Sequence, residues 1–405
     1  MNADVCIIGA GLSGAYIARI LASHNISVYI IDALNRVGGR LLTASSGDLG
    51  GSWIWPRSEP NMANLLQSLG IDTVPMHMDG ISMACTSDDG TRHVIANGQA
   101  AMYAACGSGA VRVRGGASKV VSELLRSVSF SSIQLGLRVT EIDYNDAKKV
   151  KIKCERREND GVQDDEEDIT AIFHCKAVVL AAPPKVLANT IKFTPNLPQD
   201  KVKSMLVTPT WMEEYSKVAV SFPRNWWRQL CMSGISIDHA GAVQTWWEAC
   251  SGIGGDGEPT LAGFVTKEGA DMLKFDDPVC FFKYISESLK RIYGVDVMEN
   301  SSNEVKAYGS YTDNGLVVTN GDVTVTYKSW LEDDFTNAKS LYDAQGLDFS
   351  CDYGDIELQR CIGPLFFAGT ETAAGAHGHM EGALTAAERS AEEILSYLSY
   401  STPGK

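Results

Sequence analysis

The chain opens on two short apolar runs separated by a stretch with helical periodicity. Residues 5–8 (Val-Cys-Ile-Ile) and residues 28–31 (Val-Tyr-Ile-Ile) are rich in β-branched side chains, which is typical of parallel strands buried on both faces. Between them, the side chains at positions 16, 17, 20 and 21 recur at the spacing of one helix face. The pattern therefore predicts a strand, a helix and a second strand at the start of an α/β fold.

A glycine-rich turn joins the first predicted strand to the predicted helix. The turn contains Gly9, Gly11, Leu12, Ser13 and Gly14. In such a turn the first glycine adopts a backbone shape closed to other residues, the second lets the main chain approach a pyrophosphate, and the third lets helix and strand pack closely. Asp32, followed by Ala33, ends the second strand, where a carboxylate can accept hydrogen bonds from a ribose. This order predicts a dinucleotide site; an incidental glycine turn in an ordinary α/β domain is the alternative.

Two more glycine segments follow, and another lies near the end of the chain. The bend at residues 35–40 contains Arg36, Gly38, Gly39 and Arg40, whose cations could fold back over the same phosphates. The segment at residues 48–54 contains Gly51, Ser52 and Trp53, and its glycines suit a backbone that lies against a flat ring. Near the other end, an apolar run precedes Gly369, Thr370 and Glu371. A single cofactor contacting all of these segments would have to be long, as FAD is.

With these segments, the chain resembles the flavin-containing amine oxidases, which include monoamine, polyamine and L-amino-acid oxidases. The resemblance implies that residues 38–40 contact the FAD diphosphate and that residues 50–53 run beside the isoalloxazine ring. It also implies that the backbone of Val139 reaches the adenine and that Glu371 binds near the ribityl chain and phosphate. By the resemblance, the chain lacks the cysteine to which membrane-bound monoamine oxidases tether FAD, so we expect noncovalent FAD.

The last predicted helix begins beside a run of small residues that ends at Gly378. By the resemblance, the Met380 N–H points at the pyrimidine edge of the flavin. A helix that starts there would present unpaired N–H groups and a positive dipole end to the negative charge that flavin reduction creates. An ordinary helix start is the alternative.

Lys217 is the candidate catalytic residue. It lies in a predicted strand, and its segment is similar to the family strand whose lysine holds a water against flavin N5. Desolvation lowers the pKa of a lysine and lets it organise such a water. A surface lysine at a strand edge is the alternative reading of the spacing alone.

Substrate recognition is where the chain departs from its relatives. His379 stands where many family members have a tyrosine of an aromatic cage, and it could act as a base or a hydrogen-bond donor. Trp246, Trp247 or Tyr342 could rebuild the cage, although tryptophans on strands are more often core residues. The nearby His377 lacks a third ligand at suitable spacing, so we expect no metal site.

The predicted fold class is α/β, with an FAD-binding Rossmann-like domain and an interleaved α+β substrate domain built on a mostly antiparallel sheet. The FAD-binding domain is expected at residues 1–75, 113–205 and 336–405, and the substrate domain at residues 76–112 and 206–335. The stretch between Gly70 and Gly116 has far fewer residues than the helical insert that roofs the active site in larger relatives. We therefore expect an open site or one closed by a partner subunit in a homodimer.

Composition excludes several classes of protein. The net charge of −15 argues against nucleic acid as a partner, and acidity could draw in a cationic amine or simply favour solubility. Ten cysteines are scattered without a CxxC pair, which favours reduced thiols. No leader or membrane-length apolar run is visible. We therefore expect a soluble, cytoplasmic protein.

These observations predict an FAD-dependent oxidase that removes hydride from a carbon bearing nitrogen. The product would be an imine, and dioxygen would reoxidise the flavin to give hydrogen peroxide. The alternatives are an L-amino-acid oxidase, a biosynthetic imine-forming enzyme and a flavin-binding scaffold without turnover. An amino-acid substrate would need a cation for its carboxylate, for which the sequence offers Arg57, Arg92, Arg112 and Arg114.

Overall fold

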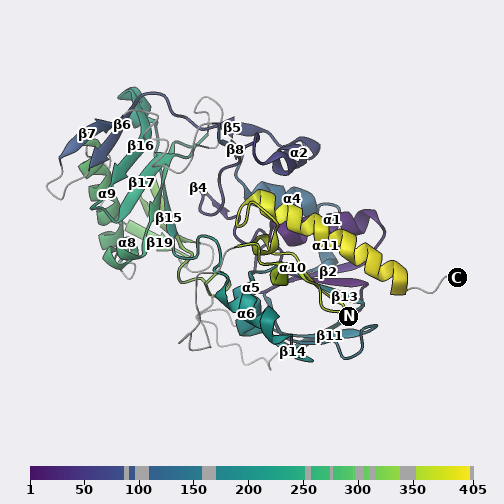
Figure 1. Cartoon of the computed structure of the whole chain (residues 1–405). Helices are drawn as coiled ribbons and strands as arrows, with labels where there is room; N and C mark the ends of the chain where they lie inside the picture. Colours follow the sequence, from purple (N-terminus) through teal and green to yellow (C-terminus); the bar gives the residue numbers. More distant parts are fainter. Residues whose placement is uncertain are drawn as a thin grey trace. The chain divides into compact units, whose positions relative to one another are not determined.

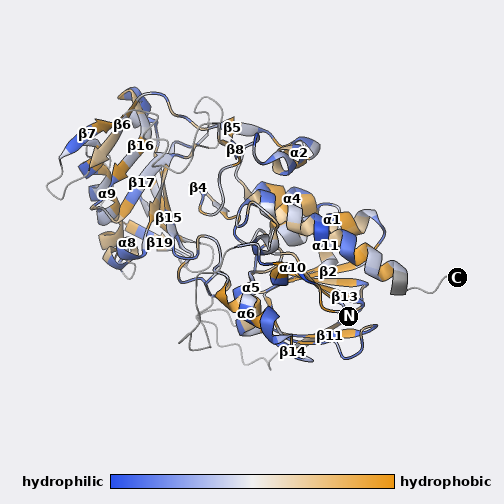
Figure 2. Cartoon of the chain, in the orientation of Figure 1, coloured by the Kyte–Doolittle hydropathy of each residue, from blue (hydrophilic) through white to orange (hydrophobic). Residues whose placement is uncertain are grey.

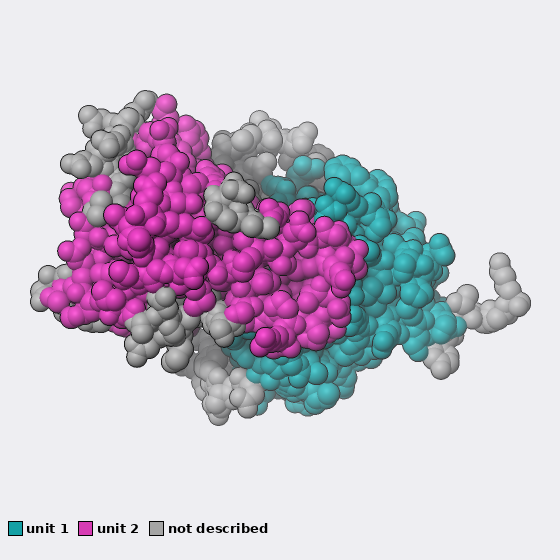
Figure 3. All heavy atoms as spheres, turned by 90° about the horizontal axis from the view of Figure 1, so that it is seen from above, with its two compact units in different colours: residues 1–40, 120–213, 334–405 teal, residues 41–119, 214–333 magenta. Residues whose placement is uncertain are grey.

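The computed structural model describes residues 1–85, 91–95, 109–156, 170–250, 257–273, 277–294, 296, 305–309, 315–337 and 353–401. The chain forms two compact units, coloured separately in Figure 3. Unit 1 comprises residues 1–40, 120–213 and 334–405, and unit 2 comprises residues 41–119 and 214–333. The segments expected from the sequence differ from this division at residues 41–75 and 113–119, which cluster with unit 2, and at residues 206–213 and 334–335, which cluster with unit 1.

Unit 1 is built on a five-stranded parallel sheet (Figure 1). Its order is β22 (Leu365–Phe367), β13 (Ala177–Leu180), β1 (Val5–Ile8), β2 (Val28–Asp32) and β9 (Ile133–Leu135). All residues of β1 and β13 are buried, and β2 and β13 are coloured as hydrophobic in Figure 2. The continuous apolar runs thus form the interior strands that the sequence pattern predicts.

Helices and a smaller sheet complete unit 1. The helices are α1 (Leu12–Ser23), α5 (Pro184–Thr190), α6 (Gln199–Val207), α10 (Ile356–Gln359) and α11 (Met380–Ser401). The four-stranded sheet has the order β12 (Thr170–Cys175), β11 (Val150–Arg156), β10 (Leu137–Asp143) and β14 (Lys192–Thr194). α1 and α11 come from opposite ends of the chain and pack together, with the Tyr16 hydroxyl 2.9 Å from Glu388 Oε1. The first and last helices of the chain are therefore neighbours within this unit.

Unit 2 is built on a nine-stranded, mostly antiparallel sheet. Its order is β19 (Val305–Tyr308), β20 (Leu316–Asn320), β21 (Val323–Ser329), β15 (Ser216–Ser221), β18 (Thr260–Val265), β17 (Val243–Glu248), β16 (Met232–Asp238), β6 (Ile81–Cys85) and β7 (Arg92–Ile95). The β16–β6 pair is parallel and the other pairs are antiparallel. Further elements include α2 (Pro60–Ser68), β5 (Thr73–Pro75), β8 (Val111–Val113), α7 (Trp226–Gln229), α8 (Lys267–Met272) and α9 (Pro278–Tyr293).

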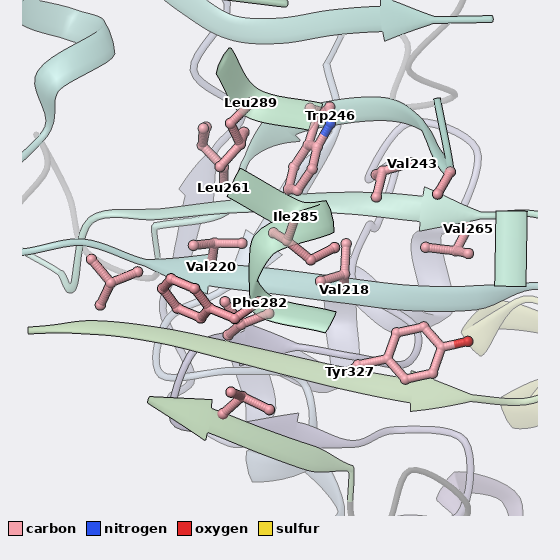
Figure 4. Packing of buried hydrophobic residues seen from close by; sticks show 14 of the residues in the cluster. Val218, Val220, Val243, Trp246, Leu261, Val265, Phe282, Ile285, Leu289 and Tyr327 are labelled. Atoms are coloured by element: carbon pink, nitrogen blue, oxygen red, sulfur yellow. The ribbon is translucent and has the colours of Figure 1, made fainter. Parts of the chain in front are cut away.

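The main core of unit 2 lies between one face of this sheet and α9. Asp277 caps the start of α9 through the N–H groups of Val279 and Cys280, and Gly294 in the left-handed conformation ends the helix. Its apolar side packs on strand residues that include Val218 and Val220, as Figure 4 shows. Because side chains alternate along a strand, Lys217 and Ala219 belong to the opposite face.

That opposite face carries a buried ion pair. Lys328 pairs with Lys217 in the β15–β21 register, and its Nζ lies 2.5 Å from Asp333 Oδ2. The two paired side chains are 0% and 2% exposed. The indole of Trp330, 4.7 Å from Lys328 Nζ, donates a 2.8 Å hydrogen bond to the Leu49 carbonyl. The pair thus supports the loop that follows β4 (Gly47–Asp48).

We predict that Asp333→Asn lowers the free energy of unfolding by about 3–5 kcal/mol, because the substitution removes the buried carboxylate that pairs with the Lys328 ammonium. Denaturant titration measures this change. Asp322→Asn, at an exposed position, is the matched control and should change stability little. Equal stability of the two variants would show that the Lys328–Asp333 pair is not needed.

Candidate active site

The glycine turn after β1 has the geometry that close helix–strand packing requires. Gly9 has φ of +110°, and a Cβ added there would lie 3.1 Å from the Ala181 carbonyl carbon. A Cβ at Gly14 would lie only 2.0 Å from the Gly9 carbonyl oxygen. Gly11 meets no such obstruction, since its nearest neighbours are 3.9 Å away. Gly9 and Gly14 are therefore fixed by the protein's own packing, and Gly11 leaves the start of α1 uncovered by a side chain.

The start of α1 presents backbone donors. Gly11 is its N-cap and no side chain caps it, and Leu12 begins the helix. The Ser13 hydroxyl donates to the Ala368 carbonyl, which ties the helix to the segment after β22. The Asp32 carboxylate at the end of β2 accepts from the N–H groups of Ala10 (2.6 Å) and Leu34 (2.8 Å) on either side of Ala33. A diphosphate and a ribose fit this arrangement of donors and carboxylate.

The second glycine bend lies against the first. The Gly38 N–H donates to the Ala10 carbonyl at 2.9 Å, and Gly11 and Gly38 form a β-bridge. Arg36 Nη1 donates to the Gly39 carbonyl at 2.9 Å and holds the bend closed. Two glycine segments that are far from each other in sequence thus form one cradle in unit 1.

An ion pair joins this cradle to the C-terminal glycine segment. Arg40 binds the Glu371 carboxylate through two nitrogens, at 2.6 Å and 3.2 Å, and Glu371 is 0% exposed. Gly369 precedes Glu371, and the Thr370 hydroxyl donates to the His379 carbonyl at 2.9 Å, one residue before α11 starts at Met380. The predicted cofactor residues of the two chain ends are therefore brought together. Val139, on β10, is buried beside a bulge in the smaller sheet.

His379 belongs to an aromatic group in unit 1 that sequence reasoning missed. Its ring centroid is 5.5 Å from that of Trp211, which is 6.0 Å from Tyr353. His377 stacks on Tyr353 at 5.8 Å. Gly378 has φ of +78°, and a Cβ there would lie 2.1 Å from Trp211 Cγ. No group of three or more His, Cys, Asp or Glu residues that could hold a metal ion occurs among the described residues.

Lys217 is buried in unit 2 and donates to the loop after β4. Its Nζ lies 2.9 Å from the Gly50 carbonyl and 2.6 Å from Ser52 Oγ, and the residue is 3% exposed. The rings of Trp247, Trp53 and Phe264 surround the ammonium at 5.2–5.7 Å. Gly51 lies between the two hydrogen-bonding residues. A lysine and the Gly-Gly-Ser-Trp segment, far apart in sequence, thus form one cluster.

Burial changes the protonation of this lysine. Desolvation lowers the pKa of Lys217 to about 8, Asp48 opposes the shift, and Arg112 adds to it. Desolvation also raises the pKa of Asp48, and this shift is opposed by hydrogen bonds from the Thr43 hydroxyl at 2.5 Å and the Ala117 N–H at 2.9 Å. Lys217 is therefore able to gain and release a proton close to neutral pH.

Of the three residues proposed to rebuild an aromatic cage, the two tryptophans lie on opposite faces of the sheet. Trp246 is 0% exposed and belongs to the core beneath α9 (Figure 4). Trp247 faces the opposite side of the sheet, where it contacts Trp53 at 4.9 Å and Phe264 at 4.8 Å. Tyr342 lies outside the described residues. Of the three, Trp247 is beside Lys217.

From the lowered pKa of Lys217 we predict how the free energy of unfolding depends on pH. The unfolded chain has a lysine pKa of about 10.4, so between pH 8 and that value the unfolded state binds more protons than the folded state. Stability contributed by this group therefore rises with pH across that window and is flat below it. We expect the difference in unfolding free energy between wild type and Lys217→Met to shift by about 3 kcal/mol in favour of the wild type over the window. Denaturant titrations at several pH values measure it, and a difference independent of pH would contradict the assignment.

The chain belongs to the family of flavin containing amine oxidoreductases. The family model matches residues 99–395, and a model of NAD(P)-binding Rossmann-like domains matches residues 7–69. Flavin-containing amine oxidase A of Equus caballus is 22% identical over 98% of this chain and 85% of its own length. Amine oxidase B of Bos taurus is also 22% identical, over 97% of this chain and 86% of its own length.

Solved structures share the fold. Putrescine oxidase bound to putrescine has a TM-score of 0.70 at 20% identity and covers 98% of this chain and 99% of its own. Cyclohexylamine oxidase from Brevibacterium oxydans has a TM-score of 0.73 at 18% identity and covers 98% of this chain and 100% of its own. Among the described residues, no helix combines the length and apolarity that crossing a membrane requires.

Proposed function

We propose that this protein is an FAD-dependent amine oxidase. The substrate loses a hydride from the carbon that bears nitrogen and a proton from that nitrogen, and it leaves as an imine. Dioxygen takes up the two electrons and two protons and leaves as hydrogen peroxide. When bound, FAD supplies the two-electron acceptor for this exchange.

The observation that carries the proposal is the environment of Lys217. A lysine that is 3% exposed, held by the Gly50 carbonyl and Ser52 Oγ and ringed by three aromatic side chains, has no structural ion pair to explain it among the described residues. Its lowered pKa suits the positioning of a water and the movement of a proton near neutral pH. We assign it that role.

The residues that would hold FAD fall into groups with distinct tasks. The turn from Gly9 to Gly14 with Asp32 and Ala33 would bind diphosphate and ribose, as their geometry allows. Arg36, Gly38, Gly39 and Arg40 would support the phosphates, with Glu371 orienting Arg40. Gly51, Ser52 and Trp53 would lie beside the flat ring, Val139 near the adenine, and Gly378 and Met380 at the start of α11 near the pyrimidine edge. The cofactor would be held without a covalent bond.

His379 is assigned to the substrate side, as a hydrogen-bond donor or base. Its contact with Trp211 gives it an aromatic neighbour, so Trp211 could help His379 to orient an amine. Trp247, in unit 2, stays a separate candidate for substrate contact. The substrate we expect is a small amine or an amino-acid-derived amine. A flavin-binding scaffold without turnover would not require a buried lysine such as Lys217.

A peroxide-coupled screen tests the proposal. The panel should contain primary amines, diamines and L-amino acids, and should include putrescine and cyclohexylamine because similar structures are named for them. We expect at least one compound to yield hydrogen peroxide in an amount equal to that of the carbonyl compound released when water hydrolyses the imine. Peroxide without amine consumption would indicate uncoupled flavin oxidation, and no peroxide with any compound would favour the scaffold.

A further inference from the structure

Arg112 is a buried cation for which the described residues supply no ion-pair partner. It lies on β8 and is 4% exposed. Its Nε is fully buried and has no hydrogen-bond acceptor, and no carboxylate among the described residues lies within ion-pair distance of its guanidinium. A buried guanidinium without a counter-charge costs several kcal/mol, and an arginine does not escape this cost by losing its proton.

The two carboxylates that act electrostatically on Arg112 already accept hydrogen bonds from other groups. Glu248 accepts from Trp227 Nε1 at 2.8 Å and from Arg228 Nε at 2.7 Å, with a further hydrogen bond from Arg228 Nη2. Asp48 accepts from the Thr43 hydroxyl and the Ala117 N–H. These carboxylates attract Arg112 only at longer range, while burial lowers its pKa. The guanidinium therefore retains its capacity to bind one more anion.

Burial distinguishes Arg112 from the other arginines that the sequence offered for a carboxylate. Arg57 and Arg92 are exposed. The Arg114 side chain is 36% exposed, and its Nε lies 3.7 Å from Asp72 Oδ2. A solvated or paired arginine has little to gain from a ligand, whereas a desolvated and unpaired one gains a full charge-assisted interaction.

The position of Arg112 connects it to the cluster of Lys217. Val111, its neighbour on β8, exchanges backbone hydrogen bonds of 2.8 Å and 2.9 Å with Ile54. The same segment carries Gly50 and Ser52, the hydrogen-bond acceptors of Lys217. The two buried cations also influence each other electrostatically. The carboxylate of a ligand would be attracted by Arg112.

We propose that Arg112 binds the carboxylate of the substrate, so that the amines oxidised are amino acids or other amines that carry an acidic group. The planar fork of a guanidinium matches a carboxylate with two parallel hydrogen bonds. This inference deepens the proposed oxidase function and rests on it. The same guanidinium can bind a phosphate of the cofactor. The experiments distinguish a substrate carboxylate from a cofactor phosphate.

The first measurement is independent of turnover. Arg112→Met removes an uncompensated charge at nearly constant volume, so we expect the Tm of the holoenzyme to rise without ligand. Benzoate and isovalerate should raise the Tm of the wild type and leave that of Arg112→Met unchanged. Arg224→Met, at an exposed arginine of the same unit, is the matched control and should behave as the wild type. A lower Tm in Arg112→Met, or no effect of carboxylates on the wild type, overturns the proposal.

The second measurement compares each amino acid with its decarboxylated amine. The pairs are phenylalanine with phenethylamine, leucine with isoamylamine, and ornithine with putrescine. We expect the wild type to favour at least one amino acid over its amine by tenfold or more in kcat/KM, with Arg112→Met losing this preference through KM and Arg112→Lys retaining part of it.

The outcomes separate the carboxylate site from the oxidase function. Carboxylate-dependent Tm shifts that require Arg112, with no oxidation of any compound, would support the anion site and refute the oxidase. Oxidation of amines and amino acids at equal efficiency, unaffected by Arg112→Met, would support the oxidase and refute this inference. Loss of FAD from purified Arg112→Met, with carboxylates inert on the wild type, would assign Arg112 to a cofactor phosphate and also refute it.

Discussion

Gly14→Ala is expected to abolish FAD binding and yield colourless protein. The added Cβ would lie 2.0 Å from the Gly9 carbonyl oxygen, closer than any relaxed contact allows, and would make a tight contact of 3.2 Å with Ile7 Cγ2. Both neighbours belong to the strand and turn that start the cradle, so α1 must move away from β1 and its N-terminus leaves the diphosphate position. The measurement is the FAD-to-protein ratio after reconstitution with excess FAD and gel filtration.

Gly375→Ala is the matched control. Gly375 belongs to the same unit, its φ is outside the left-handed range, and nothing lies within 4 Å of an added Cβ. We expect this variant to bind FAD with the stoichiometry of the wild type. A yellow Gly14→Ala protein with unchanged stoichiometry would show that the turn is not the diphosphate site.

Lys217→Met should reduce oxidase turnover by at least about 100-fold, the lower range for a positioned proton-transfer group. Methionine fills the space between Trp53, Trp247 and Phe264 but cannot donate to Ser52 or hold a water. The FAD content should stay that of the wild type, because the predicted diphosphate residues lie elsewhere in the chain. Stopped-flow traces measure flavin reduction by the amine and reoxidation by dioxygen as separate rates.

Lys267→Met controls for the loss of a lysine. Lys267 is exposed on α8 of the same unit. Its substitution should leave the rates of flavin reduction and reoxidation unchanged. If Lys217→Met retains both rates as well, Lys217 has no chemical role and its burial has another cause. A decrease confined to reoxidation would assign Lys217 to dioxygen, and a decrease confined to reduction would assign it to the amine.

Local chemistry made much of the fold predictable. Residues 5–8 and 177–180 are apolar at every position, and the structure buries each of them in one parallel sheet. The glycine spacing at Gly9, Gly11 and Gly14 predicted the turn, since each glycine answers a separate steric demand. The clustering of residues 41–75 with unit 2 was not predictable. It depends on backbone pairings such as that of Ile54 with Val111, which local sequence does not encode.

The candidate site was predictable only in part. The family resemblance singled out Lys217, yet its acceptors Gly50 and Ser52 are about 165 residues away in sequence. Alternation along a strand places Trp246 and Trp247 on opposite faces, but it does not say which face is core. Four arginines were equivalent candidates in the sequence, and only burial separates Arg112 from the others. Such properties arise from tertiary packing and leave no local signal.

The most direct test of the proposed oxidase is anaerobic mixing of the purified protein with the amine and amino-acid panel while the flavin absorption band is recorded. We predict one FAD per chain and complete bleaching of the band by at least one compound, followed by recovery of the band and release of hydrogen peroxide when dioxygen is admitted. A protein that cannot be loaded with FAD, or a flavin band that no amine or amino acid bleaches, would contradict the proposal.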